Sequence, residues 1–367
     1  MTLEKKRRVG KKISAPVLVF RVFLCVFLAL VLCVAGLFGY LTVTEFRPNA
    51  SEPAETLYES ERKIVILPGE TYTALSMNIG YAGLGAESDF FMDGGKSVQT
   101  DETFVRKNMD GIQGIIRETD WDFLLLQEVD RDSRRSYRID EGLVIAEMIQ
   151  ENAQYITNFS CDWVPFPVPM IGRVRSGLLS ASYAEPVEGK RISLPVPFSW
   201  PVRVANLKRA LLVQRFRVAG TDKQLVMINL HLEAYDDGEG KKQQTDVLVN
   251  LIRSEYEKGN YVIAGGDFNQ SFPGALDAYP ILDGELWTPG VLSEDMLPEG
   301  WTLQYDLKTP SCRLLNAPLY SGDCKQLYVI DGFICSPNVI TESVDTLDRG
   351  FEFSDHNPVL LQFTLAP

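Results

Sequence analysis

The stretch YVIAGGDFN, residues 261–269, shows the pattern on which the fold depends: a short aliphatic run that ends in an acidic residue and an amide. Similar β-branched or aliphatic runs, bounded by turn residues, recur along the chain as is typical of strands. They are TYTALSMNI, WDFLLLQ, SGLLSAS, ALLVQRFRV, QLVMINLHL, QLYVIDGFIC and PVLLQFTL. The chain from residue 71 onward is therefore predicted to be rich in short strands.

Three segments between these runs have helical spacing. Apolar residues recur three and four positions apart in 101–118 and 240–258, and more weakly in 140–151. Many strands with few helices favour sheets that pack on each other and carry helices on their outer faces. We therefore predict an α/β (α+β) domain over residues 71–367.

The N-terminal segment is apolar and follows a basic one. Residues 22–44 carry no charge, and a helix of this length, at about 1.5 Å per residue, spans a bilayer core of about 30 Å. A buried core helix or a cleaved signal peptide is the alternative, although the apolar stretch of a signal peptide is only about 7–15 residues long. The basic run KKRRVGKK at 5–12 favours a cytoplasmic N-terminus. We predict a basic cytoplasmic tail at 1–21, a single-pass transmembrane helix at 22–44 and an extracytoplasmic domain in the cell membrane.

The charge is divided unevenly along the chain. The first 44 residues hold seven basic residues and one acidic residue, a net of +6, so the total of −13 leaves −19 for the remainder. Residues 45–70 are polar and acidic, which indicates a stalk. A body with this charge repels polyanions unless a metal or a local basic groove intervenes.

The cysteines do not form a metal-binding pattern. No CxxC motif occurs, so neither a zinc ribbon nor a thioredoxin-like site is expected. Cys312 and Cys324 lie in a loop-like segment, and their spacing is compatible with a disulfide in an oxidising compartment or with free thiols.

Polar side chains follow or interrupt the predicted strands at several places. A carboxylate directly after an aliphatic run needs a partner, because burying a lone charge is costly. A single such residue is often only a capped strand end, but a whole set is hard to explain in that way. The set comprises Asn78, Glu128, His231, Asp267, Asn269, Asp331, Asp355 and His356, which include both histidines of the chain.

These residue types suit metal-assisted hydrolysis of a phosphoester. A hard cation such as Mg²⁺ or Mn²⁺ takes oxygen ligands, which Glu128, Asn78 and Asp355 can supply. Asp267 can act as the base toward water while Asn269 holds the nucleophile or the phosphate. The histidines can donate to the phosphoryl oxygens, and Asp331 can hold His356 in its tautomer and favour the imidazolium.

The ordered motifs SMN, QEVD, NLHLEA, GGDFN, IDGF and SDHNPV resemble the endonuclease/exonuclease/phosphatase (DNase I-like) superfamily. The resemblance covers about residues 71–365, and GDFN with SDH are its most specific parts. It implies a four-layer sandwich of two packed mixed β-sheets flanked by helices. It also implies Mg²⁺ at Glu128, a phosphate contact by His231, and Asp267 with Asn269 at the attacking water. The remaining implied element is an Asp331–His356 pair.

Two further stretches resemble a membrane-anchored branch of this family found in Gram-positive bacteria. They are NIGYAGLGAESDFFMDGG at 78–95 and RRSYRID at 134–140. The sequence departs from apurinic endonucleases at Gly80, where those enzymes carry a second acidic residue. The segment 83–100 either lines the substrate pocket or forms a glycine-rich surface loop. Similarly, Arg134, Arg135, Tyr137 and Arg173 are candidates to bind a substrate phosphate or headgroup, or they form an exposed basic turn.

The sequence therefore predicts a membrane-anchored phosphodiesterase or phosphomonoesterase that hydrolyses a small or lipid-borne phosphoester. A surface nuclease that degrades extracellular DNA is the alternative, and nucleic acid is the less favoured substrate because the body is acidic. A catalytically silent binding module on the same fold is a third possibility, which the complete set of acidic and histidine residues disfavours.

Overall fold

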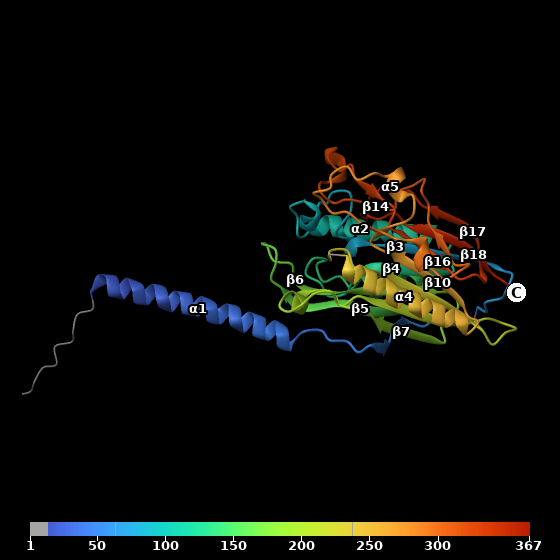
Figure 1. The fold of residues 1–367 in the computed structure, drawn as a ribbon, viewed down its shortest axis with the longest axis horizontal. Helices are drawn as coiled ribbons and strands as arrows, with labels where there is room; N and C mark the ends of the chain where they lie inside the picture. Colours follow the sequence, from blue (N-terminus) through green and yellow to red (C-terminus); the bar gives the residue numbers. More distant parts are fainter. Residues whose placement is uncertain (1–13, 63, 237) are drawn as a thin grey trace, which may run out of the picture. The chain divides into compact units, whose positions relative to one another are not determined.

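The computed structural model describes residues 14–62, 64–236 and 238–367 (Figure 1). The chain divides into two compact units, Met1–Glu45 and Phe46–Pro367. The basic run predicted to be a cytoplasmic tail lies largely outside the described residues, which begin at Ser14.

Helix α1, Ala15–Val43, occupies the first unit. Among the helices of the described residues, it is long and apolar enough to cross a membrane, by length and composition alone. The helix begins seven residues before the predicted start at 22, because Pro16 stands in its first turn, where the fixed φ of proline is favourable. Arg21, the charged residue directly before the predicted segment, lies within the helix.

Two seven-stranded mixed sheets form the second unit. Sheet A has the order β1-β7-β8-β9-β10-β16-β13, with bounds Ser51–Pro53, Glu188–Ser193, Ala210–Arg217, Gln224–His231, Tyr261–Asp267, Asp331–Cys335 and Thr302–Gln304. Sheet B has the order β17-β18-β3-β4-β6-β5-β2, with bounds Val339–Thr346, Val359–Leu365, Thr71–Asn78, Phe123–Asp130, Gly172–Ser182, Asn152–Val164 and Glu55–Tyr58. Two short pairs lie outside them, β11 (Gln270–Ser271) with β12 (Gly290–Val291) and β14 (Cys312–Arg313) with β15 (Leu327–Tyr328).

The inner faces of the two sheets share one apolar core. It contains Phe123 and Phe363 from sheet B together with Phe216, Ile263 and Phe333 from sheet A, all at most 1% exposed. Burying each such side chain stabilises the fold by roughly 1.5–3 kcal/mol relative to exposure. The prediction that sheets pack face to face is confirmed.

Helices cover the outer faces, which completes four layers (Figure 1). Helix α2, Glu102–Glu118, and helix α3, Glu141–Ile149, pack on sheet B. Helix α4, Glu239–Glu257, packs on sheet A through Leu248 and Ile252. The short helix α5 spans Ala275–Ala278. The three longer helices match the predicted segments because each has an apolar face of helical period.

The segment predicted to be a stalk, 45–70, differs from that expectation. Strand β1 pairs with β7 at the edge of sheet A, and β2 pairs with β5 at the edge of sheet B. Ile66 is 1% exposed and belongs to the central core. The segment is polar because edge strands expose one side to solvent, so composition alone does not distinguish it from a linker.

Candidate active site

Three chemistry-bearing residues stand in one row across sheet A. Asp267, the last residue of β10, lies opposite His231 at the end of parallel strand β9 and opposite Asp331 at the start of antiparallel strand β16. Gly266 makes this close packing possible. Its φ is +145°, and a Cβ added there would stand 2.0 Å from the carbonyl oxygen of Leu230. The second glycine of GGDFN is thus required by the backbone next to the site.

Sheet B supplies Asn78 and Glu128 from neighbouring strands. Asn78 ends β3, and Glu128 lies in β4 where the register against β6 shifts between Leu126 and Val129. Glu128 has a φ of +54°, a left-handed conformation that costs energy in a residue with a side chain and is common at functional sites. The bulge and the strained backbone place a charged side chain that follows a buried run, FLLL, at the cavity.

Asn78 joins the two sheets at this point. Its Nδ2 donates to Asp267 Oδ2 at 3.0 Å and to Glu128 Oε1 at 3.3 Å, while its Oδ1 accepts from the backbone N–H of Gly80. The amide therefore holds the carboxylate of sheet A against that of sheet B. Its Oδ1, the atom that would bind a metal, already accepts the hydrogen bond from Gly80. The role of Asn78 as a metal ligand therefore stays a prediction.

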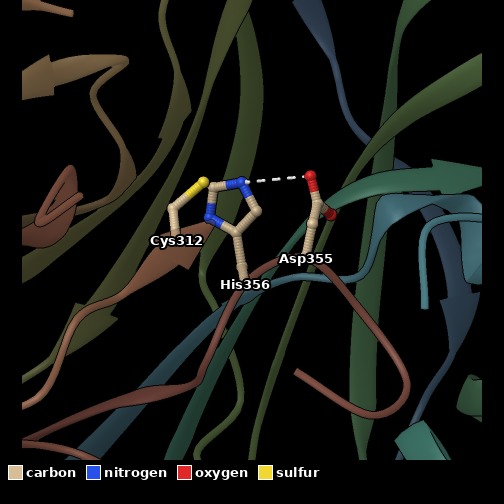
Figure 2. A group of neighbouring side chains, drawn as sticks. All are labelled: Cys312, Asp355 and His356. Carbon is tan, nitrogen blue, oxygen red and sulfur yellow. Dashed lines mark ion pairs between the residues drawn. The ribbon is translucent and has the colours of Figure 1, made fainter. Parts of the chain in front are cut away.

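The loop before β18 brings the second histidine to the row. His356 Nδ1 lies 2.8 Å from Asp331 Oδ2, which also accepts from the Ser311 hydroxyl at 2.7 Å. Its Nε2 lies 3.8 Å from Asp267 Oδ2 and 3.9 Å from Asp355 Oδ2. Figure 2 shows the ring between Asp355 on one side and Cys312 on the other. The predicted Asp331–His356 pair is present in the geometry.

Asn269 follows Asp267 closely and also has a left-handed backbone, with a φ of +50°. Its backbone N–H donates to Asp267 Oδ1 at 2.8 Å, and its Nδ2 donates to the carbonyl of Leu232. His231 Nε2 lies 3.3 Å from Asp267 Oδ2. All eight residues singled out from the sequence are thus gathered around Asp267 and His356.

Burial separates the protonation behaviour of these groups. It raises the pKa of Asp267 to about 7, helped by the charge of Asp331, and raises the pKa of Asp355 to about 7, helped by Glu128. The Asp331 and Asp355 carboxylates raise the pKa of His356 well above its usual value against the effect of its burial. Burial, together with the positive charges of Arg209 and His356, lowers the pKa of His231. His356 is therefore the charged donor, and His231 is a neutral imidazole.

The acidic groups fit a hard divalent cation. Two sets of side-chain atoms lie close enough to share an ion, Asp267 with Asp331 and His356, and Cys312 with Asp355 and His356. Burial raises the pKa of the Cys312 thiol to about 12, so it is a neutral group and a poor ligand. The charge of Glu128 adds to burial in raising the pKa of Asp355, so a cation beside the two would be stabilised. The oxygens of both side chains are the ligand type that Mg²⁺ and Mn²⁺ prefer.

A cavity of about 460 Å³ opens onto these residues. Its lining includes Leu84, Phe90 and Asp93, so the segment 83–100 lines the pocket, the first of its two expected roles. Asp93 is buried and accepts from the Tyr235 hydroxyl at 2.9 Å. The walls are mostly aromatic and aliphatic, while the acidic and histidine residues occupy one region of the lining.

Of the basic turn, only Arg135 reaches the cavity. Its guanidinium binds both oxygens of buried Asp130 and lies 3.6 Å from the centroid of the Tyr81 ring. Arg134 donates to the carbonyl of Met170, Tyr137 to the carbonyl of Thr100, and Arg173 pairs with Asp132. These three side chains are absent from the cavity lining, which fits the alternative of a surface turn.

Sequence reasoning missed Arg209. It precedes β8, lines the cavity and is 4% exposed, yet its Nε and Nη1 have no hydrogen-bond partner among the residues that the structure describes. Its ion pair with Glu233 is long, at 3.7 Å. A buried guanidinium with free donors at an acidic cavity suits an anionic substrate group. The signal was a cation directly before the aliphatic run ALLV, the counterpart of a carboxylate directly after one.

The six cysteines of the chain are free thiols. Cys324 Sγ contacts Leu314 O at 3.2 Å rather than Cys312. Of the two alternatives left open by the sequence, the structure therefore has the thiols.

Comparisons with known proteins show the family and agree with this fold. A sequence model of the "Endonuclease/Exonuclease/phosphatase family" matches residues 93–356. No curated protein matches by sequence. An endonuclease/exonuclease/phosphatase from Beutenbergia cavernae superposes with a TM-score of 0.54 at 16% identity, over 81% of this chain and 72% of that one. The catalytic domain of human nocturnin with a bound sulfate anion gives 0.52 at 16% identity, over 83% and 97%.

Proposed function

The chain belongs to the endonuclease/exonuclease/phosphatase family of metal-dependent phosphoesterases and nucleases, and on that premise we propose what it hydrolyses and where. The proposed function is that of a membrane-anchored, extracytoplasmic phosphoesterase that uses Mg²⁺ or Mn²⁺ to hydrolyse a small or lipid-borne phosphoester. The observation that carries the proposal is the buried row His231–Asp267–Asp331 with His356 against it, at an apolar cavity.

Asp267 is the base in this proposal. Its pKa of about 7 allows it to accept a proton from water near neutral pH. The backbone N–H of Asn269 and the side-chain amide of Asn78 each donate to one of its two oxygens and so fix their orientation. Water then attacks phosphorus as the bond to the leaving oxygen breaks, and its proton moves to Asp267. Fixing the carboxylate in advance avoids the entropic cost of arranging base and water at the moment of reaction.

The positive groups around Asp267 stabilise the charge that develops on the phosphoryl oxygens. His356 is kept as an imidazolium by Asp331, and Arg209 offers buried donors that no acceptor of the described residues uses. Because both side chains are buried, such donors act more strongly than in solvent. Glu128 and Asp355 would hold the divalent cation, which when bound polarises the phosphoryl group and helps ionise the attacking water.

The charge of the domain supports a small or lipid-borne substrate. Beyond residue 44 the chain carries −19, and proteins that bind a nucleic-acid backbone normally offer several Lys and Arg to its phosphates. The cavity volume of about 460 Å³ suits one headgroup. Helix α1 supports membrane anchoring, which would keep the site near lipid phosphates.

Kinetics of residues 46–367, which form a compact unit of their own, would test the proposal. The fragment should hydrolyse bis-p-nitrophenyl phosphate or p-nitrophenyl phosphate with Mg²⁺ or Mn²⁺, and EDTA should abolish turnover. Phospholipid should be hydrolysed with a higher kcat/KM than plasmid DNA. Efficient plasmid cleavage that falls steeply as salt is raised would instead establish the nuclease.

Topology needs a separate measurement on the full chain. A protease added to intact cells should degrade the domain from outside while leaving the N-terminal end protected. A domain that resists the protease in intact cells, or a soluble form cut near residue 44, would contradict the proposed anchoring.

A further inference from the structure

Two loops expose an unusual number of large apolar side chains. The first is the tip of the β5–β6 hairpin, residues 163–171 (WVPFPVPMI), and the second is 194–207 (LPVPFSWPVRVANL), between β7 and β8. We call their exposed apolar side chains the apolar rim. It comprises Trp163, Phe166, Val168, Met170, Trp200 and Val202, whose exposed fractions run from 38% to 84%.

The apolar rim is continuous with the active-site cavity. Phe166 and Ile171 of the first loop and Phe198, Val202 and Leu207 of the second all line the cavity that Asp267 and His356 also line. The second loop packs against β5, since the backbone N–H of Lys208 donates to the carbonyl of Asn158. An apolar molecule that contacts the rim therefore has an apolar path toward the acidic and histidine residues.

The rim is presented rigidly. Prolines stand at 165, 167 and 169 in the first loop and at 195, 197 and 201 in the second. Proline fixes φ and reduces the entropy that a loop loses on binding. The side chains of the apolar rim are thus held in solvent and are not buried in the core. Exposed apolar patches beside a cavity mark surfaces that contact a partner or a membrane.

The charge of the rim points to a lipid surface. Neither loop contains an Asp or Glu, although the chain beyond residue 44 carries −19. Arg203 lies within the second loop, and Arg173 follows the first and is paired with Asp132. Phospholipid surfaces are commonly anionic, so a tip free of acids avoids repulsion there. Tryptophan is also favoured at the boundary between headgroups and acyl chains, and phenylalanine is common on apolar faces that enter it.

We propose that the apolar rim inserts into the interfacial layer of a lipid bilayer, so that the phosphoester of a membrane lipid enters the cavity directly from the membrane. Its chemistry rests on the proposed phosphoesterase function, but its membrane binding does not. The inference selects the lipid-borne substrate over a small soluble one, and it assigns the two loops as the membrane-contacting surface.

Vesicle flotation of residues 46–367 tests the binding without helix α1. The fragment is mixed with vesicles of phosphatidylcholine, with or without phosphatidylglycerol, and compared with the double variant Val168→Ser/Trp200→Ser. Both positions are exposed and neither lines the cavity. The matched control is Tyr320→Ser/Ile340→Ser, two side chains 74% and 51% exposed on η5 (Leu319–Ser321) and β17.

We expect the wild-type fragment to float with the vesicles and the rim variant to lose at least about tenfold in vesicle affinity, whereas the control keeps it. Hydrolysis of soluble bis-p-nitrophenyl phosphate should stay unchanged in the rim variant, while hydrolysis of vesicle phospholipid should fall in proportion to binding.

Two outcomes would overturn the inference. One is a wild-type fragment that does not float, including one that self-associates through the rim in sedimentation. The other is equal vesicle affinity of the rim variant and the wild type. Rim-dependent flotation without turnover of any phosphoester would uphold the membrane surface and contradict the proposed function instead.

Discussion

Strand β8 has an arginine near each end, Arg209 buried and Arg215 half-buried, and the two have opposite surroundings. Arg209, directly before the strand, lies at the end of sheet A where β9 and β10 finish in His231 and Asp267. Within the described part of the chain, its Nε and Nη1 have no hydrogen-bond partner. Arg215, near the other end, donates to Glu188 at 3.1 Å and to Glu255 at 2.6 Å. Glu255 also accepts from Lys258 and Asn260.

The carboxylates at the two ends differ in the same way. Despite burial, the hydrogen bonds from Arg215 and Lys258 lower the pKa of Glu255 to about 2, whereas burial near Asp331 raises the pKa of Asp267 to about 7. At the Arg215 end each cation is paired with a carboxylate, so this end contributes to stability. At the Arg209 end, the guanidinium can donate to a substrate and the Asp267 carboxylate can accept a proton or face a cation. This arrangement indicates a binding site.

Replacing the carboxylate at each end of β8 by the isosteric amide should have the largest effect, because the two substitutions test catalysis at one end and stability at the other. Asp267→Asn removes the proposed base, so kcat should fall by about 10²–10⁴. Glu255→Gln, the control at the paired end, should leave kcat unchanged at a temperature well below Tm. Steady-state kinetics with bis-p-nitrophenyl phosphate measure both. Near-wild-type kcat for Asp267→Asn would remove Asp267 from the mechanism.

The two arginines allow a second comparison. Arg209→Met should lower kcat/KM by about 10²–10³, because a preorganised donor to the phosphoryl oxygens is lost. It should cost little stability, since Arg209 has only the long ion pair with Glu233 to lose. Arg215→Met should instead lower the free energy of unfolding by about 1–3 kcal/mol and keep kcat/KM. Equal effects of the two variants on kcat/KM would contradict the assignment of Arg209.

The smallest expected effects are on stability, and they have opposite signs in EDTA at pH 8. Asp267→Asn should raise the free energy of unfolding by about 1–2 kcal/mol, because burial and the charge of Asp331 make the ionised carboxylate costly at that pH, as its raised pKa indicates. Glu255→Gln should lower it by up to about 3 kcal/mol, because a carboxylate with a depressed pKa is lost. Chemical denaturation of each variant measures both.

The pH dependence follows from the two pKa values. The folded pKa of Asp267, about 7, lies above its ordinary value of 3.8, so the gain from Asp267→Asn should grow from about pH 4 and level off above about pH 7. The folded pKa of Glu255, about 2, lies below its ordinary 4.5, so the loss from Glu255→Gln should be complete above about pH 4.5 and vanish toward pH 2. A shared sign at pH 8 would refute the contrast.

Much of the fold and of the site was determined by local sequence. The strands and the longer helices were predicted because their apolar residues recur with a period that one face of a strand or helix must have to be buried. The sequence predicts Asn78, Glu128 and Asp267 as site residues because polar side chains that follow buried runs need partners where the strands end. The apolar segment from residue 22 onward was predicted by its length and lack of charge.

Only the tertiary structure decided which of several similar side chains lies at the cavity and which lies away from it. Arg134 and Arg135 are adjacent, yet Arg135 stacks on Tyr81 at the cavity while Arg134 donates to Met170 outside it. Arg209 and Arg215 flank the same aliphatic run, and residues 51–58 became edge strands although their composition is that of a linker. Periodicity fixes which face of an element is buried, but the pairing register between distant strands fixes what that element meets. That register depends on contacts across the whole chain, which no local stretch of sequence contains.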